Sequence, residues 1–582
     1  MKKIIYLLAI AGMLPVLSGC ENFLDSQSYT TKNSQTFPIT GDDANQMVTG
    51  VYNGLNLLMD NNNTATAYFL LAEIAADDRF GGGGLNDKDP QAINHLMYNN
   101  ADMLNSFWSA HYTGIARANA ALAALDNLDD GDLKNQKIGE VEFLRAFFYF
   151  ELVQTFGDVP LMKAAPANVK EAETAPAQTS QDSIYRFIAS DLLDAYNRMP
   201  AYKWNDSHVP SGTVTKWAAA GLLARVWLFY TGFYQQQSLP TEDGQVTSDQ
   251  VAAALKDCID NSGHSLVPDF RSLWGYTNKD TKKDYVYAQD APDWVKDGTN
   301  PEHVFVKKMV PHPTWQSNPQ CNQFLLFFAL RNGTTTDYTQ LFPMGQGWGF
   351  GPVSTELWTE WITDEPNDMR RQASIYNQEL EDPDYADQWG ADRQMEETGL
   401  WQKKVVATTA YGNSASAKGL WNYFTSAPDY FNITQDNFQH GGGTDLIIIR
   451  FADILLMHSE ITKTADGMNT VRARAGLPAV AYSDNALRNE RRHELAFEGG
   501  RWGDIRRWGI AADALSKMYG IPVHNDNLWT TMKQQGSGIV DRYNKTKGFF
   551  MIPQSQIDLA NGALKQNAGW DASAVFNSWV DN

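Results

Sequence analysis

Apolar residues recur at helical spacing over much of the chain. A clear example is residues 140–160, EVEFLRAFFYFELVQTFGDVP, in which the positions three or four apart are Val141, Leu144, Phe148 and Leu152. This spacing builds one apolar face of a helix. Gly157 follows the last periodic residue and Pro160 comes soon after it, which is a helix stop signal. The pattern therefore predicts a helix that ends near residue 157.

Further helical patterns predict a stack of antiparallel helices in the N-terminal half. Residues 214–233 are a second long example, and their small side chains at 218–221 leave room for a closely packed helix. Shorter helical stretches lie at 44–59, 104–126, 181–199 and 248–261. Successive helices of this length favour hairpins of the tetratricopeptide kind, although no tetratricopeptide signature recurs at a fixed period. We expect this scaffold to cover residues 43–262.

Helical periodicity fades over residues 263–445 and then returns. The middle part is rich in Gly, Pro, Asn, Asp and Thr, and its strand-like runs lie at 303–310 and 403–408. This composition indicates irregular chain with a few strands. Helical pattern resumes at 446–520, and we expect mostly loop at 521–582. The sequence thus predicts a mainly α protein in which a helical-hairpin scaffold carries a loop-rich region with few strands.

The first residues have the pattern of a lipoprotein leader. The apolar run from Ile4 to Leu17 is shorter than the roughly 20 residues that span a bilayer, so we expect residues 1–19 to be a signal peptide. Cys20 ends a Leu-Ser-Gly-Cys sequence that resembles the bacterial lipobox. Acylation of Cys20, as by palmitate, would anchor the protein to a membrane that it does not span. The polar residues 20–42 suit a tether. The alternative is an ordinary leader with a chance cysteine.

Composition narrows the partners and the chemistry. The chain has 582 residues and a net charge of −21, whereas binding to nucleic acid needs basic surface, so no nucleic-acid partner is expected. Two further cysteines, Cys258 and Cys321, are too few for a disulfide framework or a metal site. We expect both to be buried and inert. Neither a cofactor nor a metal is predicted.

Seven blocks of sequence, in order, resemble the SusD/RagB family of outer-membrane lipoproteins of Bacteroidetes. The blocks are CENFLD, EVEFLRAFFYFELVQTFGDVPL, GTVTKWAAAGLLARVWLF, RFADILLMHSE, VRARAGLP, ERRHELAFEGGRWGDIRRWG and IPQSQIDLANGALKQNAGW. Together they cover nearly the whole mature chain. The chain departs from the family pattern in the short segment between Glu460 and Val471. It also has Asn567-Ala568-Gly569-Trp570 where the family more often has Asn-Pro-Gly-Tyr.

The resemblance implies both a fold and a function. Members of the family look like a tetratricopeptide scaffold whose loop-rich face binds glycans. They sit as a lid on a SusC-like TonB-dependent transporter, which imports the captured oligosaccharide for nutrient uptake and polysaccharide utilisation. By this resemblance the chain is a lipid-anchored, non-catalytic glycan-binding protein of the cell surface and outer membrane. Residues 446–582 would form the C-terminal helical region and tail of the family.

Tryptophans concentrate in the irregular part of the chain and are the first candidates for sugar contact. Nine of the 18 tryptophans lie in residues 270–425. The broad electron-rich ring of tryptophan packs on the C–H face of a sugar and loses little entropy when held. Each one singly is more often a core residue. The candidates, chosen for their Gly, Pro, Asp or Asn neighbours, are Trp274, Trp294, Trp315 and Trp348. Trp358 and Trp361 look like a packed helix face.

The second candidate is the segment AADDRFGGGGLNDKDPQ, residues 75–91, in which the family often places ligand contacts. Asp77, Asp78 and Arg79 offer partners for sugar hydroxyls, and the glycines allow close approach to the backbone. The alternative is a helix end with solvated charges and a flexible loop. The four glycines lack the context of a nucleotide site. Asp87 and Asp89 are possible Ca²⁺ ligands, but no EF-hand spacing is present, so no Ca²⁺ site is predicted.

One helical block is crowded with charge. In NERRHELAFEGGRWGDIRRWG, Glu490, Glu494 and Glu498 are spaced four residues apart, which suits either acid–base chemistry or a buried ion network. Arginine meets carboxylates with a planar fork, and the expected partners are Arg491, Arg492, Arg501 and Arg506. The family treats this block as scaffold, so we expect the ion network, with His493 included.

Two other functions compete with glycan capture. A glycoside hydrolase with two carboxylates is one, because 68 acidic residues leave that chemistry open. A helical scaffold that binds only protein is the other. Turnover of a carbohydrate would favour the enzyme, and absence of any glycan affinity would favour the scaffold.

Overall fold

The structure is a computed structural model. It describes residues 37, 40–57, 67–166, 168, 177–279, 282, 287–310, 321–331, 345–381, 393–406, 409–414, 417–422, 443–526, 528–577 and 579. Within these residues the protein is mainly helical and its strands are short, as the sequence predicts. The leader, Cys20 and Trp315 lie outside them.

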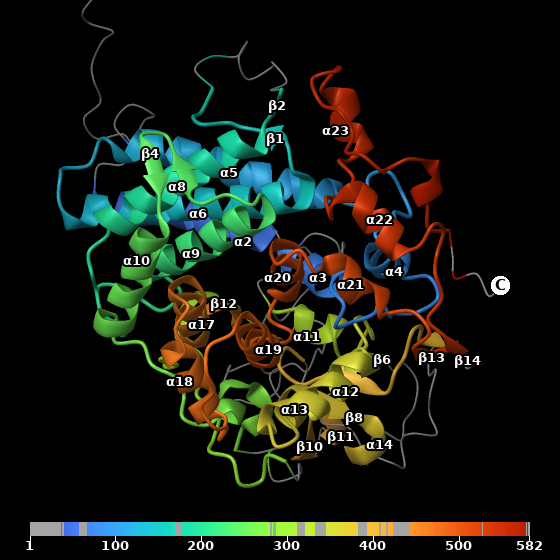
Figure 1. Ribbon diagram of the computed structural model, residues 1–582. Coiled ribbons are helices and arrows are strands. Elements are labelled where there is room, and N and C mark those ends of the chain that lie inside the picture. Colours follow the sequence, from blue (N-terminus) through green and yellow to red (C-terminus); the bar gives the residue numbers. More distant parts are fainter. Residues whose placement is uncertain are drawn as a thin grey trace, which may run out of the picture.

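The N-terminal helices pack on one another in chain order. They are α2 (Gly41–Leu57), α5 (Asn105–Leu125), α6 (Asp132–Phe156), α8 (Gln181–Arg198), α9 (Lys216–Phe233) and α10 (Ser248–Asn261). Figure 1 shows them, coloured blue to green, as one layer of the molecule. Local sequence sets their ends. The Thr215 side chain caps α9, and Thr247 and Gln250 form a capping box at the start of α10.

Helix α6 is buried on nearly all sides rather than on one apolar face. The apolar residues at helical spacing are buried as expected, and burial extends around the helix because α6 packs on both α5 and α8. Two of its buried charged side chains have partners on the neighbouring helices. Arg145 forms two hydrogen bonds of 2.8 Å with Asp191 of α8, and Glu151 lies 2.7 Å from the His111 ring of α5. These pairs allow a polar helix to sit at the centre of the core.

Helices from the C-terminal part lie between the helical layer and the loop-rich region (Figure 1). They are α17 (Phe451–Thr462), α18 (Asp466–Arg474), α19 (Asp484–Glu494) and α20 (Arg501–Arg507). Helix α17 packs on α9 and α10, and α20 packs on α9. A β-carbon on Gly221 would lie 2.9 Å from the Ile454 side chain. The small residues at 218–221 thus permit the close helix contact that the sequence predicts.

The remaining elements are short. The other helices are α3 (Tyr68–Ala75), α4 (Lys88–Asn94), α11 (Phe324–Phe327), α12 (Thr355–Asp364), α13 (Met369–Ser374), α14 (Gln378–Glu381), α21 (Ala511–Ser516), α22 (Ile539–Thr546) and α23 (Gln554–Leu559). The 3₁₀ helices are η2 (Phe270–Leu273), η3 (Gly275–Thr277) and η8 (Ala572–Ala574). In the described part of the tail, residues 521–582, the helices α22, α23 and η8 are short and most residues lie outside regular helix, which agrees with the mostly loop structure that the sequence predicts.

The strands of the described residues form two-stranded sheets. The antiparallel pairs are β1 (Val159–Pro160) with β2 (Gln178–Thr179), β3 (Leu239–Thr241) with β4 (Gly244–Val246), β5 (His303–Lys307) with β12 (Leu446–Arg450), β8 (Ile375–Asn377) with β9 (Leu400–Gln402), β10 (Thr409–Ser414) with β11 (Ala417–Asn422), and β13 (Pro522–Asn525) with β14 (Leu528–Thr531). Strands β6 (Leu330–Arg331) and β7 (Gly345–Gly347) pair in parallel.

One predicted strand is displaced. Strand β9 ends at Gln402, before the run expected to be extended at 403–408, of which 403–406 are bends. The reason is that two lysines turn inward. The Lys403 ammonium binds Glu381 at 2.8 Å, and the Lys404 ammonium binds Glu498 at 2.7 Å. The run at 303–310 begins with strand β5, as expected.

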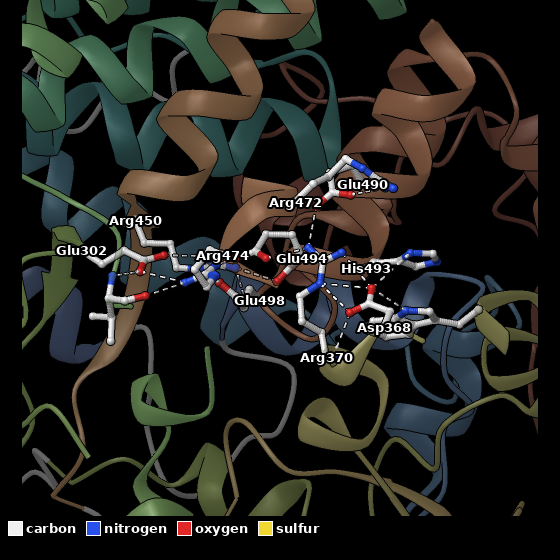
Figure 2. Close-up of polar contacts among 12 residues, drawn as sticks. Glu302, Asp368, Arg370, Arg450, Arg472, Arg474, Glu490, His493, Glu494 and Glu498 are labelled. Carbon is white, nitrogen blue, oxygen red and sulfur yellow. Dashed lines mark hydrogen bonds and ion pairs between the residues drawn. The ribbon is translucent and has the colours of Figure 1, made fainter. Parts of the chain in front are cut away.

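A buried network of arginines and carboxylates joins these parts (Figure 2). The side chain of Glu494 is fully buried and binds Arg370 of α13, Arg450 at the end of β12 and Arg474 of α18. Glu490 binds Arg370 at 2.5 Å, and Arg450 also binds Glu302 at 2.7 Å and Glu498 at 2.6 Å. The charges of four separate segments are thereby neutralised inside the protein.

The charged block thus forms the ion network predicted from its sequence, but with different partners. The glutamates bind arginines outside the block, whereas Arg491 binds Asp453 and Asp504 at 2.8 and 3.0 Å. The guanidinium of Arg506 donates to a carbonyl oxygen, that of Gln154. Burial alone would raise the pKa of Glu494, but Arg474, Arg450 and Arg370 hold that pKa well below its usual range. This carboxylate has no proton to give at neutral pH.

Removing the charge of Glu494 should destabilise the whole protein. The Glu494→Gln change leaves buried arginines without their partner, which costs about 3–5 kcal/mol of unfolding free energy. The matched control is Glu242→Gln, which breaks the exposed Lys163–Glu242 pair and should cost less than about 1 kcal/mol. Urea unfolding measures both. Equal small losses would show that the network does not hold the fold, and the folded fraction of Glu494→Gln should keep its ligand affinity.

Acid should weaken the joint between α9, α17 and α19. Burial would raise the pKa of Asp453, but Arg225 and Arg491 more than offset this and lower it to about 2. A pKa that is depressed in the folded state gives stability that is present above the unfolded value and lost as pH falls towards the folded value. Unfolding free energy should therefore fall between about pH 4 and pH 2. In Asp453→Asn protein the fall should be smaller, starting from a lower value at neutral pH. An unchanged acid profile would exclude this role.

Candidate functional site

The glycine segment after α3 makes a tight loop against three other parts of the chain. Gly82 and Gly83 have φ values of +66° and +74°, which other residues adopt only with strain. A β-carbon on Gly82 would lie 2.4 Å from the Gly349 carbonyl oxygen. Single β-bridges connect Gly82 to Phe350 and Gly84 to Gln394. The glycines therefore serve close backbone packing.

Asp77 and Asp78 are buried in ion pairs rather than open to a ligand. Asp77 binds Arg501 at 2.7 Å, and Asp78 binds Arg492 at 2.6 Å. Burial opposes ionisation of Asp77, yet Arg501 and Arg492 lower its pKa. These pairs attach the end of α3 to α19 and α20. They also explain why two arginines of the charged block face away from its glutamates.

Arg79 is fully buried as well. Its guanidinium binds Glu73 and Gln402 at 2.6 Å and donates to the Gly351 carbonyl oxygen at 2.9 Å. The rings of Phe328 and Phe497 each lie 4.4 Å from its central carbon. In this structure Asp77, Asp78 and Arg79 are buried beneath the glycine loop and fix the chain where the loop begins. The alternative of solvated charges at the helix end is not what the structure shows.

Two of the four candidate tryptophans are enclosed. Trp274 and Trp294 are 3% and 8% exposed. They line a crevice of about 30 Å³, which has room for about one water molecule and none for a sugar ring. The Lys404 ammonium lies 5.0 Å from the Trp274 ring. Loop residues beside these tryptophans wrap their rings instead of exposing them.

Trp348 is the candidate that reaches the surface. It is half-buried, and its ring packs against Phe327 and Phe350, with ring centres 4.8 and 6.2 Å away. Arg331 lies beside it, donating to the Trp348 carbonyl oxygen at 3.3 Å and binding the Asp87 carboxylate at 2.9 Å. A supported ring, a guanidinium and a carboxylate thus meet at the glycine loop.

A neighbouring hairpin adds exposed groups that the sequence did not single out. Arg393 and Asp526 form an exposed ion pair of 3.0 Å, and the Asp526 amide donates to the Gln394 carbonyl oxygen at 2.9 Å. Trp529 of β14 is 61% exposed, with its ring 5.2 Å from that of His524. Trp529 lies outside the tryptophan-rich part of the sequence. The sequence Asn-Asp-Asn that follows His524 is a turn signal from which a hairpin could be predicted here.

We call this set the glycine-loop surface. Its members are Asp87, Arg331, Trp348, Arg393, Asp526 and Trp529. Aromatic rings beside paired charges can pack on C–H bonds and exchange hydrogen bonds with hydroxyl groups. Asp87 is engaged by Arg331 and by the Gly84 amide. Across the described residues no three His, Cys, Asp or Glu side chains gather as a metal site.

The two remaining cysteines are buried, as expected. Burial raises the pKa of Cys258 to about 12 and that of Cys321 to about 11. Both therefore stay protonated at neutral pH, when a thiol is least reactive.

Family models match most of the chain. One, described as the SusD family, matches residues 332–570. Another, described as starch-binding associating with outer membrane, matches residues 22–228. The two models together contain the charged block, the glycine loop and most of the glycine-loop surface.

Similar proteins have related descriptions. SusD-like protein P2 of Formosa agariphila is 24% identical over 87% of this chain and 91% of its own length. Among solved structures, surface glycan-binding protein A from Bacteroides fluxus has a TM-score of 0.66 and 23% identity, covering 91% of this chain and 100% of that one. A laminarin-binding SusD-like protein has a TM-score of 0.66, 23% identity and coverage of 91% and 99%. These structures confirm the fold.

No helix within the described part of the chain is long and apolar enough to cross a membrane.

The glycine loop should tolerate no side chain at its tightest point. In Gly82→Ala the new β-carbon meets the Gly349 carbonyl at positive φ, so unfolding free energy should fall by more than about 1 kcal/mol. Gly50→Ala in α2 is the control, since nothing lies within 4 Å of its β-carbon and alanine favours a helix by about 1 kcal/mol. Thermal unfolding compares them. Equal stability of the two variants would contradict the packing described.

Proposed function

Because this chain belongs to the SusD/RagB family, we propose that it captures oligosaccharides at the cell surface and delivers them to a SusC-like TonB-dependent transporter. The protein would be held at the outer membrane by acylation of Cys20. The sequence up to Cys20 supports the anchor, since it has the pattern of a lipoprotein leader. The descriptions of similar proteins support a glycan as the ligand, since they include a laminarin-binding SusD-like protein and a surface glycan-binding protein from Bacteroides thetaiotaomicron in complex with laminarihexaose.

The observation that carries the proposal for this chain is the supported ring of Trp348. Phe327 and Phe350 hold this ring in place, so it loses little entropy when a sugar packs on it. Arg331 and Asp87 lie next to it and already bind each other. Arg331 can donate hydrogen bonds to sugar hydroxyl groups and Asp87 can accept them. Because the two charges neutralise each other, covering them with a sugar costs little desolvation free energy.

Asp77, Asp78 and Arg79 take a supporting role in this proposal. Their buried ion pairs fix the glycine loop, and the loop in turn fixes Asp87 and the Phe350 contact. Trp274 belongs to a core cluster of the loop-rich region, where it packs on Phe270, and Trp294 is buried in the same crevice. Direct contact with the glycan falls to Trp348 and its exposed neighbours.

The proposal includes binding without turnover. The glutamates of the charged block are buried and engaged with arginines, so they cannot reach a glycosidic bond. A hydrolase would need two accessible carboxylates flanking a sugar. On the glycine-loop surface, the half-buried carboxylates of Asp87 and Asp526 are each bound to an arginine. The proposal therefore assigns this surface to recognition.

Loss of the Trp348 ring should remove most of the glycan affinity. The test uses protein expressed without residues 1–20, first screened by calorimetry against a polysaccharide panel. Trp348→Ala should weaken binding of the best ligand about tenfold or more, because ring stacking and burial are lost. Trp358→Ala is the matched control, since Trp358 is also half-buried in the loop-rich region but packs on Arg371. Its affinity should be unchanged.

The same experiment separates the competing functions. Release of shorter sugars over hours by wild-type protein would establish a hydrolase. A panel in which no glycan binds would favour a protein-binding scaffold. Equal affinity of Trp348→Ala and wild-type protein would contradict the assignment of the site.

A further inference from the structure

A large groove lies on the helical layer, apart from the glycine-loop surface. Its volume is about 1140 Å³, at or above the usual size of a ligand pocket. Helix α2, the start of α6, the segment 202–213 and the end of β5 form its walls. It shares no lining residue with the glycine-loop surface.

The walls of this groove carry many neutral hydrogen-bonding groups. Carboxamides come from Asn45, Gln46, Asn53, Asn56 and Gln136, and hydroxyl groups come from Thr49, Tyr52, Tyr202, Ser207, Ser211 and Thr213. Charged groups on the walls are largely neutralised. Lys137 binds Glu140 at 2.9 Å, and Lys308 binds Asp445. Burial lowers the pKa of Lys307 to about 7.

One wall residue has an unused acceptor. Gln136 is 6% exposed, and its amide nitrogen donates to Glu140 and to the Val214 carbonyl oxygen. Its amide oxygen is buried and has no hydrogen-bond partner in the described structure. A buried acceptor without a donor costs about 1–3 kcal/mol, which a bound donor would recover.

We propose that this groove binds a neutral, hydroxyl-rich oligosaccharide at a second site, independent of the glycine-loop surface. A sugar hydroxyl supplies the donor that the Gln136 oxygen lacks. Carboxamides and hydroxyls on the facing walls match alternating donors and acceptors along a glycan. Exposed apolar side chains at the rim, Leu133 and Val310 at 46% and 53%, contact the C–H faces. An anionic ligand is disfavoured, because Lys137 and Lys308 on the described walls already bind carboxylates.

Gly50 offers a way to close the groove without disturbing the core. It lines the groove within α2, and a β-carbon on it would meet nothing within 4 Å. Gly50→Trp therefore fills the space with a ring. Ala253→Trp on the exposed side of α10 is the matched control, because it places the same ring on the same layer outside the groove.

The test is hydrogen–deuterium exchange of the protein with millimolar laminarihexaose, maltohexaose or hexagalacturonate. Peptides covering 41–57 and 202–213 should be protected by a neutral hexasaccharide in wild-type and Ala253→Trp protein. Trp348→Ala protein should keep this protection, which separates the groove from the first site. Gly50→Trp should abolish it and leave protection around residue 348 unchanged.

Three results would overturn the second site. They are absence of protection of 41–57 with both neutral probes, protection that persists in Gly50→Trp, and protection by hexagalacturonate alone. Failure of the proposed function is distinct, since it appears as lack of any change around residue 348 whatever happens in the groove.

Discussion

This fold depends on the pairing of charges that are buried inside it. Glu494 lies fully inside the protein and is contacted by three arginines that come from different segments. Removing such charges from water costs several kcal/mol per ion unless every charge is paired. Every charge of the network is therefore paired only when α13, β12, α18 and α19 are all in their folded positions (Figure 2). An irregular region with few backbone ladders gains a fixed position on a helical scaffold in this way.

The same helices extend this constraint to the surface. Arg492 and Arg501 belong to the charged block but bind Asp78 and Asp77 just after α3. The glycine loop starts directly after those aspartates. Its bridges to Phe350 and Gln394 then place the loops around Trp348. The proposed ligand surface thus depends on buried ion pairs behind it, and binding sites need such supporting contacts to keep a fixed geometry.

The sequence predicts the helices well because their signals are local. The range expected at 248–261 is that of α10, which has its capping box and its apolar spacing. The exposure of each tryptophan is not predicted by its local sequence, because it depends on residues distant in the chain. Trp274 and Trp294 stand beside loop-forming residues as Trp348 does, yet Lys404 and the crevice walls enclose them. Local sequence patterns likewise do not identify the arginines that bind Glu494, since they are separated from it by up to 124 residues.

Carboxylates that lie close together do not by themselves form a site for acid–base catalysis, and the arginines around Glu494 explain why. A general acid needs a proton at working pH and access to its substrate. The arginines around Glu494 lower its pKa, so it carries no proton at neutral pH. Burial of Glu494 also prevents contact with a substrate. Arginine is the residue that makes this arrangement permanent, because its guanidinium stays charged at every physiological pH. Acidic residues that are committed to structure are not available for acid–base chemistry, and the proposed recognition of a sugar therefore rests on rings, carboxamides and hydroxyls at the surface.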